Sequence, residues 1–112
     1  MWYTASVLLA GEHQMEPPVP SLWEEVILLI EAGTEEQARS TAETIGRSKA
    51  HEYYVTEPKR HVMRWTFGRV DRVCAIEEAM LKSGTELFSR FLRQSEAESL
   101  LTPFEADRAK GV

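Results

Sequence analysis

The longest apolar run in the chain extends from Val26 to Ile30 and contains no polar position. Successive side chains of a strand point to opposite sheet faces, so this run predicts a strand that is covered on both faces. A buried helix can also contain such a run. The β-branched residues and the Ala32-Gly33 break that follows favour the strand.

A helix is predicted directly after this strand, from Thr34 to Gly46, and the alternative is that it runs on to Lys49. Thr34 and Gln37 have the spacing of a capping box, and two glutamates occupy the first turn, where the helix dipole favours negative charge. The apolar positions form a narrow stripe of small residues that would let the helix lie close against a sheet: Ala38, Ala42 and Ile45.

The remaining strands are predicted from alternating or β-branched and aromatic-rich segments, at 2–10, 51–56, 61–75 and 86–92. Gly68 interrupts the alternation of the fourth strand, which indicates either a bulge or a close backbone approach there. The proline-rich stretch 11–21 is expected to be the loop between the first two strands. A short terminal helix is predicted from Gln94 to Leu101, and residues 104–112 are expected to fray.

The resulting order is strand-strand-helix-strand-strand-strand, followed by the short C-terminal helix. Strands grouped on either side of one helix predict an α+β fold. We expect a mainly antiparallel sheet of about five strands, with the main helix packed on one face. The length of 112 residues predicts a single domain, residues 1–112.

Charge and cysteine usage narrow the class of protein. The formal net charge is −5, whereas a nucleic-acid partner requires a concentrated basic surface. The longest apolar run has five residues, far fewer than the ~20 that span a bilayer. Cys74 is the only cysteine, and no signal peptide is recognised at the start. We therefore expect a cytoplasmic protein with no nucleic-acid or membrane partner.

Four sequence blocks are spread over more than half of the chain: WYTASVLL, WEEVILLIEAGTEEQA, RWTFGRVDRV and GTELFSRFL. In these blocks the chain resembles a family of small uncharacterised bacterial proteins, a domain of unknown function. The resemblance implies a compact bacterial domain. It implies no reaction and supplies no catalytic residue.

No metal site, cofactor or catalytic residue is predicted. The histidines lack the spacing of a helical or finger-type zinc site, and we interpret them as exposed loop and strand-end residues: His13, His51 and His61. Cys74 and Ser89 lack the glycine-rich elbow of a nucleophile. Glu24 and Glu25 are adjacent on a strand, so they point to opposite faces and cannot form an acid–base dyad.

Arg64 and Arg90 are the charged residues of most interest, because each lies in an aromatic-rich strand segment. Such an arginine can stack on a ring and bind the carboxylate of a ligand. The candidate ligand-binding residues are Glu24, Arg64, Trp65 and Arg90. The simpler alternative is that each arginine lays its stem across apolar surface and pairs with Glu24 or Glu86.

The function favoured by this pattern is a non-catalytic bacterial protein-interaction domain, with an immunity-like or accessory role. The alternative is a binder of a small anionic ligand through Arg64 and Arg90, and an enzyme ranks third. A homodimer is expected as well. One helix about 10 Å across covers only part of a sheet of about 24 Å, and the C-terminal segment offers little more apolar cover. Two-fold dimers are the commonest oligomers.

Overall fold

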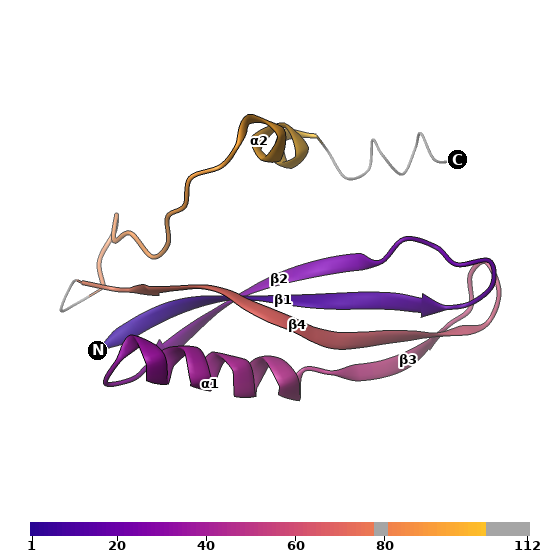
Figure 1. The fold of residues 1–112 in the computed structure, drawn as a ribbon, viewed down its shortest axis with the longest axis horizontal. Helices are drawn as coiled ribbons and strands as arrows, with labels where there is room; N and C mark the ends of the chain where they lie inside the picture. The colour runs from indigo at the N-terminus through magenta and orange to yellow at the C-terminus, as the bar shows by residue number, and fades with distance from the viewer. Residues whose placement is uncertain (78–80, 103–112) are drawn as a thin grey trace.

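The computed structural model describes residues 1–77 and 81–102, and it has an α+β architecture (Figure 1). The elements in chain order are β1 (Trp2–Gln14), β2 (Leu22–Glu31), α1 (Glu35–Ser48), β3 (His51–Val55), β4 (His61–Ala75) and α2 (Gln94–Leu101). Within the described residues the sheet has four strands in the order β2-β1-β4-β3. All three pairs of neighbouring strands are antiparallel.

The central strand β1 gives the sheet two different faces. Its odd-numbered residues from Tyr3 to Leu9 face α1, and its even-numbered residues from Trp2 to Ala10 face away. We call the second side the open face. Residues paired across strands point to the same side, so alternate β2 residues from Trp23 to Leu29 lie on the open face. Four β4 residues paired with β1 complete it: Thr66, Arg69, Arg72 and Cys74.

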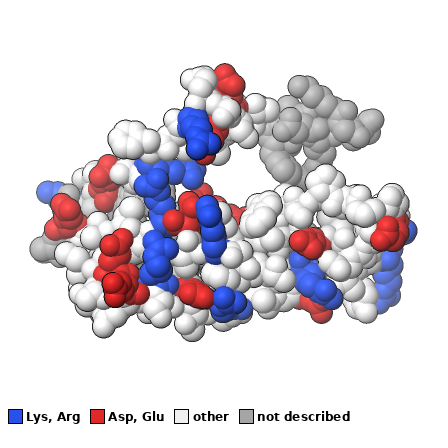
Figure 2. Space-filling view, viewed as in Figure 1, with Lys and Arg blue, Asp and Glu red and all other residues white. Residues whose placement is uncertain are grey.

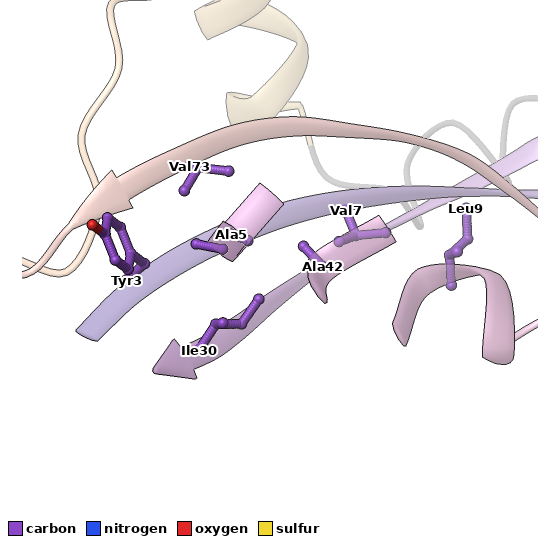
Figure 3. Packing of buried hydrophobic residues seen from close by; sticks show 8 residues of the cluster. Tyr3, Ala5, Val7, Leu9, Ile30, Ala42 and Val73 are labelled. Carbon is purple, nitrogen blue, oxygen red and sulfur yellow. The ribbon is translucent and has the colours of Figure 1, made fainter. Parts of the chain in front are cut away.

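The hydrophobic core lies between α1 and the sheet (Figure 3). Ala38 and Ala42 of α1 are fully buried in the same cluster as Val7 of β1. At Gly46 a Cβ atom would come within 2.7 Å of the Phe67 ring, so only glycine lets the helix approach this closely. The predicted small-residue stripe is confirmed at the two alanines.

The start of α1 has the predicted Thr34 cap, but the Gln37 side chain binds Gly33 and not the Thr34 N–H that a capping box requires. The Thr34 hydroxyl accepts the Gln37 N–H at 3.1 Å, and the Gln37 side chain accepts the Gly33 N–H at 3.0 Å. These bonds satisfy amides that have no partner inside a helix. The helix continues past Gly46 and stops at Ser48, with Lys49 as its C-cap, which agrees with the alternative end and not with Gly46.

The predicted fifth strand at 86–92 is wrong. These residues have no strand or helical structure, and the Thr4 hydroxyl of the open face donates a hydrogen bond to the Leu87 carbonyl. The segment therefore lies across a face of the sheet instead of beside one of its edges. Its Leu87 carbonyl is hydrogen-bonded there to a side chain and not to the backbone of a neighbouring strand.

One other predicted boundary, the end of β1, differs in the structure, and another lies outside the described residues. β1 continues to Gln14, so the loop before β2 covers residues 15–21 and not 11–21. The expected fraying at 104–112 concerns residues outside those that the structure describes. α2 has the predicted bounds, from Gln94 to Leu101.

The β1–β4 ladder contains a bulge at Gly68, one of the two alternatives predicted there. Leu8 pairs with Arg69 and Leu9 pairs with Phe67, so Gly68 has no partner on β1. A second register shift, between Ser6 and Val7, was not predicted. Bulges increase the local twist of a strand and redirect side chains.

Enlarging Ala42 to leucine tests the close contact between α1 and the sheet. Ala42 has no exposed surface, so the added atoms must displace packed neighbours. We expect the free energy of unfolding to fall by about 1–3 kcal/mol in urea denaturation. Thr41→Leu, at an exposed position of the same helix, is the control and should change stability little. Equal midpoints for Ala42→Leu and the unmodified protein would contradict the packing.

Candidate functional site

A row of apolar side chains lies uncovered on the open face. Trp23 is 58% exposed, Ile27 50% and Leu29 52%, all on β2, and Trp2 of β1 is 43% exposed. The opposite parity of the same strand is better covered, and Ile30 is only 3% exposed. The apolar run predicted a strand that is covered on both faces. The strand is instead covered on the face that carries α1 and exposed on the open face.

Trp23 forms one wall of a hollow on this face. The hollow has a volume of about 400 Å³ and is lined by Leu8, Trp23, Gly68 and Arg69. A Cβ atom at Gly68 would lie 2.9 Å from Trp23 Cζ3 and 2.7 Å from the Leu8 carbonyl oxygen. The glycine bulge of β4 thus lets the indole of β2 reach across β1. The result is an apolar recess with one guanidinium in its wall.

A polar cluster lies beside this hollow. Glu25 pairs with Leu8 across the β1–β2 ladder and accepts a hydrogen bond from the fully buried Ser6 hydroxyl at 2.5 Å. The same carboxylate oxygen lies 3.9 Å from Arg90 Nη1. Together with the bond from Thr4 to Leu87, this ion pair holds the segment before Arg90 on the open face.

The residues after Arg90 lack such support. We call residues 91–102 the arm. Phe91 is fully exposed, Leu100 is 64% exposed and Leu101 is 81% exposed. α2 has no buried residue and packs against none of the other described helices and strands. Figure 1 shows α2 on the side of the sheet opposite α1.

The predicted ligand-binding residues lie at separate places. Arg64 Nε donates to Glu52 Oε2 of β3 at 2.5 Å, and Trp65 Nε1 donates to the Tyr53 hydroxyl at 3.0 Å. Arg90 instead meets Glu25 on β2. Arg64 lies five residues along β4 from Arg69 of the hollow, which is about 16 Å at strand spacing.

Each predicted arginine has an acidic partner, but the partner is neither Glu24 nor Glu86. Glu24 is exposed and pairs with Leu9 across the β1–β2 ladder, on the side of the sheet that carries α1. Glu25 points the other way, as adjacent strand residues must. The two glutamates are therefore on opposite faces, as predicted.

The sequence interpretation of the histidines as exposed is wrong for His61, which is 6% exposed. Its Nδ1 lies 2.7 Å from the Lys59 carbonyl oxygen, so Nδ1 carries the proton. His61 Nε2 and His13 Nδ1 share a hydrogen bond, also at 2.7 Å. The pair connects the end of β1 to the start of β4. Over residues 1–77 and 81–102, no three His, Cys, Asp or Glu side chains are grouped as metal ligands.

The surface charges are mixed. Figure 2 shows Lys and Arg interleaved with Asp and Glu in the visible half of the molecule, without a broad area of one sign. Nucleic-acid binding surfaces concentrate positive charge on one face or stripe. In the described part of the chain, no helix is long and apolar enough to cross a membrane.

The sequence indicated individual residues of this site but did not indicate that they contact one another. Trp23 and Gly68 were visible as an aromatic before the apolar run and a break in alternation. Their contact depends on the register of two ladders, which is a long-range property.

Comparison with known proteins agrees with the sequence resemblance. The family described as "Domain of unknown function (DUF4288)" matches residues 2–89, which include all four strands, α1 and the segment held on the open face up to Ser89. The comparison with curated proteins and the comparison with solved structures give no match. Because the match covers well over half of its length, the chain belongs to the DUF4288 family of unknown function.

Proposed function

We propose that this chain is a non-catalytic protein-interaction domain and that it binds a second copy of itself through the open face. The observation that carries the proposal is the row of half-exposed apolar side chains on β2: Trp23, Ile27 and Leu29. These positions lie on an ordered strand, where a partner meets a surface that is already formed. An accessory or immunity-like role is in keeping with such a domain.

The composition of this surface supports binding to a protein. Tryptophan and arginine are enriched where protein interfaces bind most strongly, and the hollow brings Trp23 and Arg69 together. The apolar row is bordered by the polar group of Ser6, Glu25 and Arg90. An apolar centre with a polar rim is the usual anatomy of a protein–protein interface.

Binding of a small anionic ligand through Arg64 and Arg90 ranks second. An anion at either guanidinium would have to compete with the carboxylate already there, Glu52 or Glu25. Such competition weakens binding, because one favourable ion pair is exchanged for another. The arginines also lie near different strands and do not line a common hollow among the described residues.

The proposal is tested by the oligomeric state of the full chain. We expect sedimentation equilibrium at micromolar concentration to give twice the 12.8 kDa chain mass. Ile27→Asp should give the monomer mass, because a carboxylate in an apolar contact is strongly unfavourable. Val19→Asp is the matched control: Val19 is 42% exposed but lies in the loop before β2, so the dimer should persist. A monomer at all concentrations would refute the proposal.

A further inference from the structure

We infer that the partner copy supplies its arm to this site: α2 of each chain docks on the open face of the other. The inference rests on the proposed function, because it identifies which part of the second copy fills the surface. Leu101 of the partner is assigned to the hollow beside Trp23, and Glu98 of the partner is assigned to Arg72 of β4.

Among residues 1–77 and 81–102, α2 has no helix or strand packed against it. It has eight residues, whereas isolated helices shorter than about 12–15 residues are marginal in water. Helices of this size gain stability from packing an apolar face. α2 contacts none of the other described elements, and both of its leucines are mostly exposed. A surface outside this chain would supply the missing contacts.

Exposed apolar surface on the open face is the second observation. Trp2, Trp23, Ile27 and Leu29 are each about half exposed, which amounts to roughly 400 Å² of apolar surface at 150–250 Å² per aromatic side chain. A stable interface buries about 800 Å² on each partner. About 56–58% of an interface is non-polar, so roughly 450 Å² of this area is apolar, and one open face supplies slightly less than that. The exposed side chains of the arm add a comparable amount: Phe91, Leu92, Leu100 and Leu101.

Chemical complementarity is the third observation. Glu98 and Leu101 are three residues apart and therefore lie on the same side of α2. The hollow has apolar walls from Leu8 and Trp23 and a guanidinium from Arg69, which already forms an ion pair with Asp71 at 3.1 Å. Arg72 lies on the open face opposite Ser6, and no acidic partner is found for it among residues 1–77 and 81–102. A helix with a leucine and a carboxylate on one side fits this surface.

The geometry of the chain also favours exchange between copies. The segment before the arm is held on its own open face through Leu87 and Arg90. From this anchor a two-fold arrangement places each arm on the facing sheet and closes the assembly. Each open face is then covered partly by its own segment 87–90 and partly by the partner's α2.

The closing experiment detects contact between copies directly. A full chain with Ser99→Cys and Cys74→Ser carries a nitroxide spin label, and it is mixed with an isotope-labelled Cys74→Ser chain. We expect broadening of the Trp23 indole signal and of the Ile27 and Arg69 amide signals in the labelled chain. A label at Ser40→Cys, on an exposed position of α1, is the control and should leave these signals sharp.

A second measurement uses dimer affinity. Leu101→Asp should weaken the dimer by about tenfold to a hundredfold, since it removes a buried leucine from each copy. Ser99→Asp, at an exposed position on another side of the same helix, should not. Unchanged circular dichroism shows that each variant is folded. A dimer that is indifferent to Leu101→Asp, or one without broadening between copies, overturns the arm exchange and leaves the proposed function standing. A monomeric unmodified chain overturns both.

Discussion

Shortening Leu9 to alanine is expected to lower the free energy of unfolding by about 2–5 kcal/mol. Leu9 is 3% exposed and lies in the cluster between the sheet and α1. Its loss removes buried apolar surface and leaves a cavity that the surrounding strands and helix cannot close fully. This is a large fraction of the 5–15 kcal/mol that holds a typical domain folded. Urea denaturation gives the value.

Leu29→Ala is the matched control, because the same substitution is made in the same sheet on the other face. Leu29 is 52% exposed, so its truncation removes about half of a burial contribution and creates no enclosed cavity. We expect a loss of about 1 kcal/mol or less for the monomer. The measurement is made at low protein concentration, since the stability of a dimer depends on the concentration of its protomers.

The two leucines together test whether the sheet has one structural face and one binding face. The expected pattern is a large stability loss with retained association for Leu9→Ala, and weakened association with retained monomer stability for Leu29→Ala. Equal losses of monomer stability would mean that the open face is part of the folding core. That result would contradict the assignment of the apolar row to a partner.

The strand–helix unit could be predicted because its signals are local. The capping residues of α1 are three positions apart, and the alanine stripe is set by helical periodicity. The bulge at Gly68 was also predictable, since a glycine that interrupts an alternating strand weakens pairing there. None of these features depends on which strands are neighbours.

The fifth strand could not be predicted correctly for the opposite reason. Residues 86–92 have the apolar content of a strand, but a strand exists only beside a sheet edge that accepts its backbone groups. This segment crosses the open face, where Thr4 binds the Leu87 carbonyl. The choice between an edge and a face is made by tertiary structure.

The candidate site was predicted only in part. Arg90 was identified as a charged residue of interest, but its meeting with Glu25 and the buried Ser6 depends on where the segment crosses the sheet. Arg69 was not predicted from the sequence to be a site residue. It becomes part of the hollow because the glycine next to it lets Trp23 approach from two strands away.

Gly68→Val is expected to lower the free energy of unfolding by about 3 kcal/mol, at the upper end of overpacking costs. Its Cβ would lie 2.7 Å from the Leu8 carbonyl oxygen, which is backbone held in the β1–β4 ladder and unable to rotate away. Trp23 must move too, because its Cζ3 lies 2.9 Å from the same point. Urea denaturation gives the stability, and the indole N–H signal of Trp23 reports the displacement.

The same substitution at Gly33 separates crowding from the general effect of replacing a glycine. The nearest atom to a Cβ there is Gln37 Oε1, at 3.0 Å, and it ends a flexible side chain. Gly33→Val should therefore cost less than Gly68→Val and leave the Trp23 signal in place. Gly68→Val should also weaken the dimer, because the displaced indole no longer forms the wall of the hollow that receives Leu101 of the partner. Normal stability together with an unmoved Trp23 signal in Gly68→Val would show that the bulge does not shape this surface.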